Sequence, residues 1–167
     1  MKSYIIKLVE KFISVAAFIF PFTEVSAYFG AKVFLNADSV ALKVFYLRHI
    51  QKLVGFYQQN VYFIFAIMIA LFLASTRGSL PLSKYARFNI VQAILLNIFC
   101  SCLGATYVYL PVILRESMIG LIAANTIYCG IVLLIMYSSI LIFYGRYPKI
   151  PVISEAARLQ VQQSSLD

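Results

Sequence analysis

Between Arg87 and Arg115 the chain carries no charged side chain for 27 residues, 88–114, and this run sharply limits the possible folds. A helix rises ~1.5 Å per residue, so roughly 20 apolar residues cross the hydrocarbon core of a bilayer. The run is longer than that minimum. It therefore predicts a membrane-spanning helix over about 88–112.

Three other apolar segments are long enough to cross a membrane: 12–34, 54–76 and 117–145. The composition agrees, because 62% of residues are hydrophobic and 12% are charged, against ~45–50% and ~25% in a soluble domain. We therefore predict an all-α integral membrane protein with four transmembrane helices, forming a single membrane domain over 1–167 with a tail at 146–167.

A moderately amphipathic segment, 39–53, follows the first span. Asp38 or Ser39 can cap its first turn. Its apolar side chains recur at helical spacing, and its polar ones take the other side, although Lys43 interrupts the apolar face. This pattern predicts an interfacial helix that lies on the membrane between the first two spans.

Polar and small residues recur every four positions along the third span, which places them on one face of the helix: Asn89, Ala93, Asn97 and Ser101, with Gly104 close to the same line. The favoured interpretation is helix packing, and the alternative is a polar path for a substrate. Gln92 on this span and Asn125 on the fourth join the same candidate set. Ala66, Ala70 and Ala74 form a second small-residue stripe, on the second span, that predicts close packing.

The first span contains Pro21 and, one turn later, Glu24. Proline removes a backbone hydrogen bond and tends to kink a helix. An ionisable residue at membrane depth costs roughly 2.5–3.5 kcal/mol on insertion scales, so Glu24 is either functional or fixes packing through hydrogen bonds. Counting residues places Glu24, Asn97 and Asn125 at one depth, which predicts that Glu24 bonds to one or both asparagines. Val25-Ser26-Ala27 resembles a signal-peptide cleavage site, but the apolar stretch continues past it and favours a retained helix.

No pattern for catalysis, a metal or a cofactor is found. Cys100 and Cys102 point ~200° apart on a helix, and His49, the single histidine, has no acidic or cysteine neighbour at ligand spacing. A hydrolase triad, a zinc motif and a phosphate-binding glycine loop are absent. We expect a protein that is not an enzyme. The net charge of +8 is spread singly at the ends of apolar runs, so it indicates contact with the lipid bilayer rather than with nucleic acid.

The basic residues predict the orientation. Four spans place both termini on one side, which carries nine cations: Lys2, Lys7, Lys11, Arg77, Lys84, Arg87, Arg146, Lys149 and Arg158. The other side carries five: Lys32, Lys43, Arg48, Lys52 and Arg115. The positive-inside rule then places both termini inside.

Two motifs carry a resemblance to a known family. The first opens the third span and reads Arg87-Phe88-Asn89-x-x-Gln92-Ala93-x-Leu95-Leu96. The second lies in the tail and reads Gly145-x-Tyr147-Pro148-x-Ile150-Pro151-x-Ile153-Ser154-Glu155-Ala156-Ala157. Together they resemble the twenty-kilodalton subunit of the chloroplast inner-envelope protein translocon (the Tic complex), especially its plastid-encoded algal members. The resemblance covers roughly 40–160; the first span and its Glu24 match less clearly, so no family role is carried over to them.

The resemblance implies a four-helix protein of the plastid inner envelope with both termini in the stroma. It implies a core, channel-forming part of the machine that imports preproteins, with other translocon subunits and a preprotein in transit as partners. Two other functions stay open: a purely structural or assembly subunit of a membrane complex, and a small solute or ion permease, which would need inverted repeats and broken helices.

The outer face is expected to need a partner. Transit peptides are basic, and the five cations of that face repel a basic client, most strongly within the ~8 Å Debye length of physiological salt. We therefore expect an obligate complex in which acidic surface of a partner docks on Arg48 and Lys52.

Overall fold

The computed structural model describes residues 2–163, and that part of the chain is helical without strands. Ten α-helices and two π-helical turns follow one another: α1 (Lys2–Ala16), α2 (Ile19–Val25), η1 (Ser26–Gly30), α3 (Ala31–Leu35), α4 (Val40–Phe45), η2 (Tyr46–Ile50), α5 (Gln51–Gln59), α6 (Val61–Thr76), α7 (Lys84–Val108), α8 (Val112–Arg115), α9 (Met118–Phe143) and α10 (Ile153–Gln163). The predicted all-α class is confirmed. Of the predicted tail, residues 164–167 lie outside the described part.

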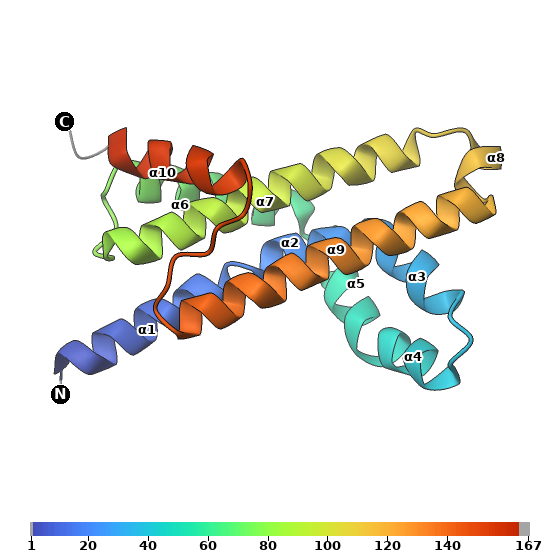
Figure 1. The fold of residues 1–167 in the computed structure, drawn as a ribbon, viewed down its shortest axis with the longest axis horizontal. Helices are drawn as coiled ribbons and strands as arrows, with labels where there is room; N and C mark the ends of the chain where they lie inside the picture. Colours follow the sequence, from blue (N-terminus) through green and yellow to red (C-terminus); the bar gives the residue numbers. More distant parts are fainter. Residues whose placement is uncertain (1, 164–167) are drawn as a thin grey trace.

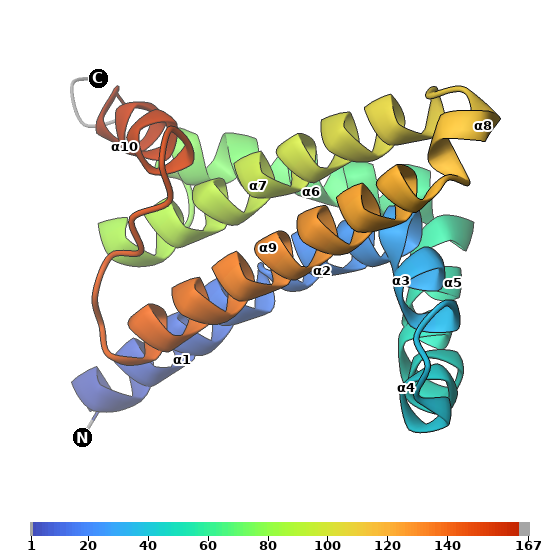
Figure 2. The ribbon, with the colours of Figure 1, turned by 45° about the vertical axis from the view of Figure 1, so that its right-hand side comes forward.

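The first predicted span, 12–34, is part of a longer broken rod made of α1, α2, η1 and α3, which runs along the molecule (Figures 1 and 2). The rod is interrupted at Ala17 and Phe18. Pro21, four residues after Ala17, has no N–H to donate to the Ala17 carbonyl. That carbonyl instead accepts from the Phe20 N–H at 3.3 Å. The proline effect predicted from the sequence therefore acts one turn before the proline itself.

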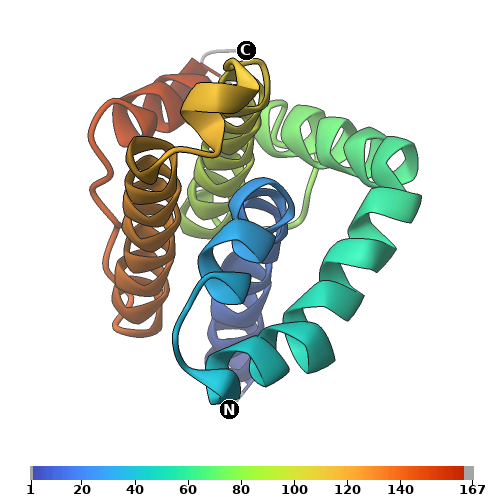
Figure 3. The same ribbon diagram turned by 90° about the vertical axis from the view of Figure 1, so that its right-hand side faces the viewer.

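The second predicted span, 54–76, is not one straight helix. The segment α4–η2–α5 forms a helical arm over 40–59, and the arm meets α6 at an angle of 81° (Figure 3). Asn60 leaves the helical conformation at φ −114° and ψ 22°, and its side-chain amide donates to the Phe56 carbonyl at 2.9 Å. Residues 54–59 thus belong to the arm, and α6 keeps 16 residues, a length of ~24 Å.

The third and fourth predicted spans correspond to α7 and α9, with 25 and 26 residues. Both are long and apolar enough to cross a membrane, and the bent pair of the arm and α6 is a further candidate for one span. A serine caps each long helix: Ser83 accepts from the Ala86 N–H at 3.3 Å, and Ser117 accepts from the Gly120 N–H at 3.2 Å. Four crossings and an interfacial position of the arm stay predictions.

Helix α7 lies at the centre. It packs against α1, α2, α6 and α10, whereas α9 packs on the rod (Figure 3). The polar and small-residue stripe of α7 is buried at Asn89, Ala93, Asn97 and Gly104. The alanine stripe of α6 behaves differently, because Ala66 and Ala70 are exposed within this chain.

The tail folds back over the start of α7. Gly145, at φ 72°, ends α9 in a Schellman motif, in which the Arg146 N–H donates to the Leu141 carbonyl at 2.9 Å. Helix α10 then lies across α7, with Ala157 and Val161 packed on Phe88 and Val91. The membrane-exit segment is therefore a docked part of the fold.

Candidate functional site

The carboxyl group of Glu24 is the centre of the candidate site. Glu24 comes from α2 and is 7% exposed. Its Oε2 accepts a hydrogen bond from the Tyr57 hydroxyl, and its Oε1 accepts one from the Ser101 hydroxyl. Three elements far apart in the sequence, α2, α5 and α7, therefore meet at one acidic side chain.

The 81° bend explains how Tyr57 reaches this position, because it turns the last residues of the arm toward α2. Sequence reasoning missed Tyr57 as a site residue. The available signal was a tyrosine on the apolar face of the arm, whose hydroxyl needs a hydrogen-bond partner once the ring is buried. Part of that face is buried against the protein, at Tyr46, Ile50 and Tyr57, whereas its Leu42 and Leu53 are exposed.

A pocket of about 310 Å³ opens beside Glu24. Its polar residues are Glu24, Tyr57, Asn97 and Ser101, and its other residues come from α6 and α7: Val61, Tyr62, Phe65, Met68, Ile98 and Cys102. The carbonyl oxygen of the Asn97 side chain is buried without a hydrogen-bond partner. The pocket therefore lies beside polar acceptor groups that are themselves mostly buried, within apolar walls.

The structure brings together only part of the predicted polar set. Asn97 and Ser101 share the pocket with Glu24. Asn125 is half-buried on α9 and is not a hydrogen-bond partner of Glu24. The prediction that Glu24 bonds directly to an asparagine is therefore wrong: residue counting gives depth, but the rotation of each helix decides which side chains meet.

Asn89 and Gln92 lie away from this site, nearer the start of α7. Asn89 is fully buried, and neither atom of its amide has a hydrogen-bond partner of acceptable geometry. The Gln92 amide donates to Ser154 Oγ at 2.9 Å and approaches the Pro148 carbonyl at 3.4 Å. Gln92 thus links α7 to the tail through hydrogen bonds.

Polar contacts link the segments at both ends of the molecule. At one end Lys11 donates to the Phe143 carbonyl at 2.7 Å, and Glu10 accepts from the Ser83 N–H at 2.8 Å. At the other end Lys32 donates to the Arg115 carbonyl and pairs with Glu116 at 3.1 Å. The hydrogen bond and the charge of Lys32 lower the pKa of the exposed Glu116 carboxyl.

Arg48 and Lys52, the predicted docking residues, are exposed on the arm. Neither forms an ion pair with another residue in the described range 2–163. The arm also exposes large apolar side chains at Val40, Val44, Phe45, Leu47 and Phe56. It is therefore an amphipathic surface that this chain leaves uncovered.

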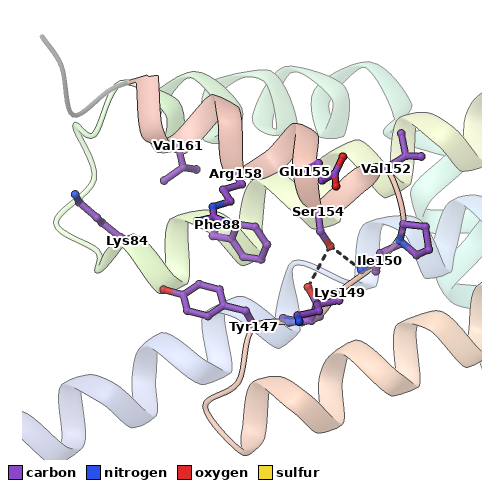
Figure 4. A pocket seen from close by; sticks show the side chains of 12 residues that line it. Lys84, Phe88, Tyr147, Lys149, Ile150, Val152, Ser154, Glu155, Arg158 and Val161 are labelled. Atoms are coloured by element: carbon purple, nitrogen blue, oxygen red, sulfur yellow. Dashed lines mark hydrogen bonds between the residues drawn. The ribbon is translucent and has the colours of Figure 1, made fainter.

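Residues of the two family motifs, one at the start of α7 and one in the tail, lie close together. The rings of Phe88 and Tyr147 meet edge to face at 5.2 Å between centroids. Ser154 donates to the Pro148 carbonyl at 3.1 Å, beside the Gln92 contact. The motif residues Pro151 and Glu155 line the adjoining groove, which lies beside α7 (Figure 4). Ala156 is half-buried on α10.

Arg87 folds back onto the loop that precedes α7. A Cβ added to Gly78 would lie 2.8 Å from the Arg87 guanidinium. Gly78 also has φ 70°, which favours glycine. The Arg87 side chain therefore occupies the room that a side chain at position 78 would need.

A protein-family profile described as "Chloroplast import apparatus Tic20-like" matches residues 8–157, which is most of the chain. The chain belongs to the Tic20 family. The resemblance inferred from the two motifs is thus confirmed, including its plastid-encoded algal type.

Curated relatives extend this result. A "Tic20 family protein Ycf60" from Gracilaria tenuistipitata var. liui is 33% identical over 159 residues, which cover 93% of this chain and 77% of the relative. One of the same name from Cyanidium caldarium is 31% identical over 153 residues, covering 92% and 74%. A "Tic20 family protein" from Synechocystis sp. is 33% identical over 159 residues, covering 92% and 93%. The Tic20 family thus includes algal and cyanobacterial relatives of this chain.

Proposed function

We propose that this Tic20-family chain is a core membrane subunit of the protein-import translocon of the plastid inner envelope, and that it contributes to the preprotein-conducting path. It has four crossings, with both termini in the stroma, and no catalytic activity of its own. The observation that carries the proposal is the Glu24 pocket, because it offers acceptor oxygens to a basic preprotein at membrane depth.

The arrangement of helices supports a role within a complex. Large apolar side chains are exposed along α6 and α9, among them Phe63, Phe65, Leu133 and Met136. Lipid and further subunits would cover these faces. The exposed cations Arg48 and Lys52 on the arm provide a surface for an acidic partner.

Site-specific photocrosslinking tests the proposal. Tyr62 lines the pocket and is 89% exposed, so a photoreactive phenylalanine analogue at this position should crosslink to a preprotein arrested in the assembled translocon. The matched control is the same analogue at Leu133 on α9, an exposed position outside the pocket. Equal crosslinking at both positions, or none at Tyr62 while a preprotein is arrested, would favour a structural subunit instead.

A further inference from the structure

A second cavity lies where the tail folds over α7. This groove, which we call the tail groove, has a volume of about 800 Å³, a size that accommodates small ligands. Figure 4 shows Phe88, Tyr147 and Arg158 around the groove, with Lys84 toward its outer end. It is lined by Lys84, Phe88, Tyr147, Pro148, Lys149, Ile150, Pro151, Val152, Ser154, Glu155, Arg158 and Val161.

The charge of the tail groove is mainly positive. Lys84, Lys149 and Arg158 line it, and Glu155 is the one acidic residue among its lining residues. All four are exposed. Within residues 2–163 none of the three cations forms an ion pair. Their positive charge is therefore available to an anion from outside the chain.

The walls of the groove are apolar and are held in place. Phe88 and Val161 are buried in the cluster that joins α7 to α10. Ser154 Oγ accepts from the Ile150 N–H at 2.6 Å and from the Gln92 amide at 2.9 Å, which fixes the backbone between Pro148 and α10. Because the groove is already formed, a ligand that binds there costs less conformational entropy of the protein.

The position of the groove indicates the class of ligand. Lys84 is the first residue of α7, and Lys149 follows the end of α9 at Phe143 by six residues. If α7 and α9 cross the bilayer, the tail groove lies at the level of the lipid headgroups, where each basic residue adds roughly fivefold to the binding of an anionic lipid.

We propose that the tail groove binds an anionic lipid, with the headgroup phosphate between Lys149 and Arg158 and an acyl chain against the apolar wall of Phe88 and Pro151. The lipid joins the tail to α7 across the two family motifs. A free phosphate would use the same cations but would leave the apolar wall uncovered, so the two anions are distinguishable.

The experiment uses the purified full chain in detergent micelles, titrated with phosphatidylglycerol or phosphatidylcholine and followed by native mass spectrometry. The wild type should bind phosphatidylglycerol in preference to phosphatidylcholine. The variant K149Q/R158Q should bind phosphatidylglycerol roughly 25-fold more weakly, because it lacks two cations. The matched control K7Q/R77Q removes one exposed lysine and one exposed arginine outside the groove and should bind like the wild type.

Glycerol phosphate, which carries the headgroup without acyl chains, separates the two sources of phosphate. It should not displace bound phosphatidylglycerol at equal concentration. Displacement would show a soluble-anion site and overturn the lipid proposal. Equal affinity of K149Q/R158Q and the wild type, or no preference for phosphatidylglycerol, would also overturn it. Lys149 and Arg158 are exposed and form no ion pair within residues 2–163, so thermal unfolding of the variant should match that of the wild type.

Discussion

Two hydroxyl groups donate hydrogen bonds to the carboxyl group of Glu24, which gives Glu24 a structural role. Tyr57 and Ser101 donate to its two oxygens. The sequence identified Glu24 as unusual but left packing and function as equal interpretations. The structure shows that Glu24 performs the packing role, because it joins α5 and α7 through α2, while its pocket supports the proposed contact with a substrate.

Two substitutions of Glu24 should show how much its hydrogen bonds contribute to the free energy of unfolding. Glu24→Ala leaves the Tyr57 and Ser101 hydroxyls without their acceptor, and each unsatisfied buried group costs ~1–3 kcal/mol. We expect a loss of about 2–6 kcal/mol in the free energy of unfolding for the two groups together. Glu24→Gln keeps one acceptor oxygen and should lose less than half as much. Unfolding in mixed micelles measures the stability of both variants, and Asp38→Asn, at an exposed position, is the control. If Glu24→Ala unfolded like the wild type, the hydrogen-bond assignment would be contradicted.

Gly104 lies so close to a neighbouring side chain that the packing there has no room for one additional carbon atom. A Cβ on Gly104 would overlap the ring of Tyr28, which packs directly on α7. We expect Gly104→Ala to destabilise the protein by ~1–3 kcal/mol, the usual cost of overpacking. Gly130→Ala is the matched control, because a Cβ there meets no atom within 4 Å, and it should be neutral or stabilising in a helix. Equal thermal unfolding of the two variants would argue against the Tyr28 contact.

At the scale of elements, the tail and the arm depart most from what the sequence predicted. The arm continues into α6 without a loop of any length, yet the two differ in direction by 81° at Asn60. The tail contains Val152 at φ 64°, which a β-branched residue rarely adopts. Both features place side chains at a site: Tyr57 beside Glu24, and the lining residues of the tail groove beside α7.

Ser154 is expected to control the docking of α10. Its hydroxyl takes part in hydrogen bonds with Gln92, Pro148 and Ile150. Ser154→Ala should lower the stability of the docked tail by about 1–3 kcal/mol and increase tryptic cleavage at Arg158. Thr126→Ala is the control, because the Thr126 hydroxyl bonds only to Ile122 in its own helix. An unchanged cleavage rate in Ser154→Ala would show that apolar packing alone holds α10.

The ion pair between Lys32 and Glu116 should give the contact between α3 and the α8–α9 turn an acid sensitivity. The folded pKa of Glu116 lies below its ordinary value of 4.5, so the folded state binds fewer protons than the unfolded state between these two values. The stabilisation is complete above the ordinary pKa and is lost as the pH falls through the folded pKa. Glu116→Gln should therefore remove part of the stability loss below pH ~4.5. Thermal unfolding at a series of pH values checks this, and identical pH profiles would refute it.

At the scale of the whole molecule, polar contacts join the long elements at two ends of the molecule. Contacts of Lys11 with Phe143 and of Glu10 with Ser83 join α1, α7 and α9 at one end, and Lys32, Arg115 and Glu116 meet at the other. The rod, α7 and α9 therefore run between the same two ends (Figure 2). This arrangement is compatible with three parallel crossings by the rod, α7 and α9, and the fourth crossing, by α6, stays a prediction.

Cysteine labelling tests this topology. In a cysteine-free background, Ser39→Cys before α4 and Ser79→Cys in the loop before α7 introduce thiols at two exposed positions. We expect an impermeant maleimide to label them from opposite sides of sealed inner-envelope vesicles, with Ser79→Cys on the stromal side. Detergent-solubilised samples, in which both must react, serve as the control. Labelling of both from the same side would contradict a crossing between them.

The sequence alone determined the helical class, the long apolar helices α7 and α9 and the break in the first helix near Pro21. These features depend on the length of the apolar segments, the positions of the charges and the local backbone chemistry. All three follow from residues that are close together in the sequence. The family motifs were also visible in the sequence, although their mutual contact was not. Only the tertiary structure decided that Glu24 meets Tyr57 rather than an asparagine, that Gly104 receives the Tyr28 ring and that α10 docks on α7. Each of these depends on how a helix is rotated and bent relative to its neighbours, and periodicity within one helix carries no information about that relation.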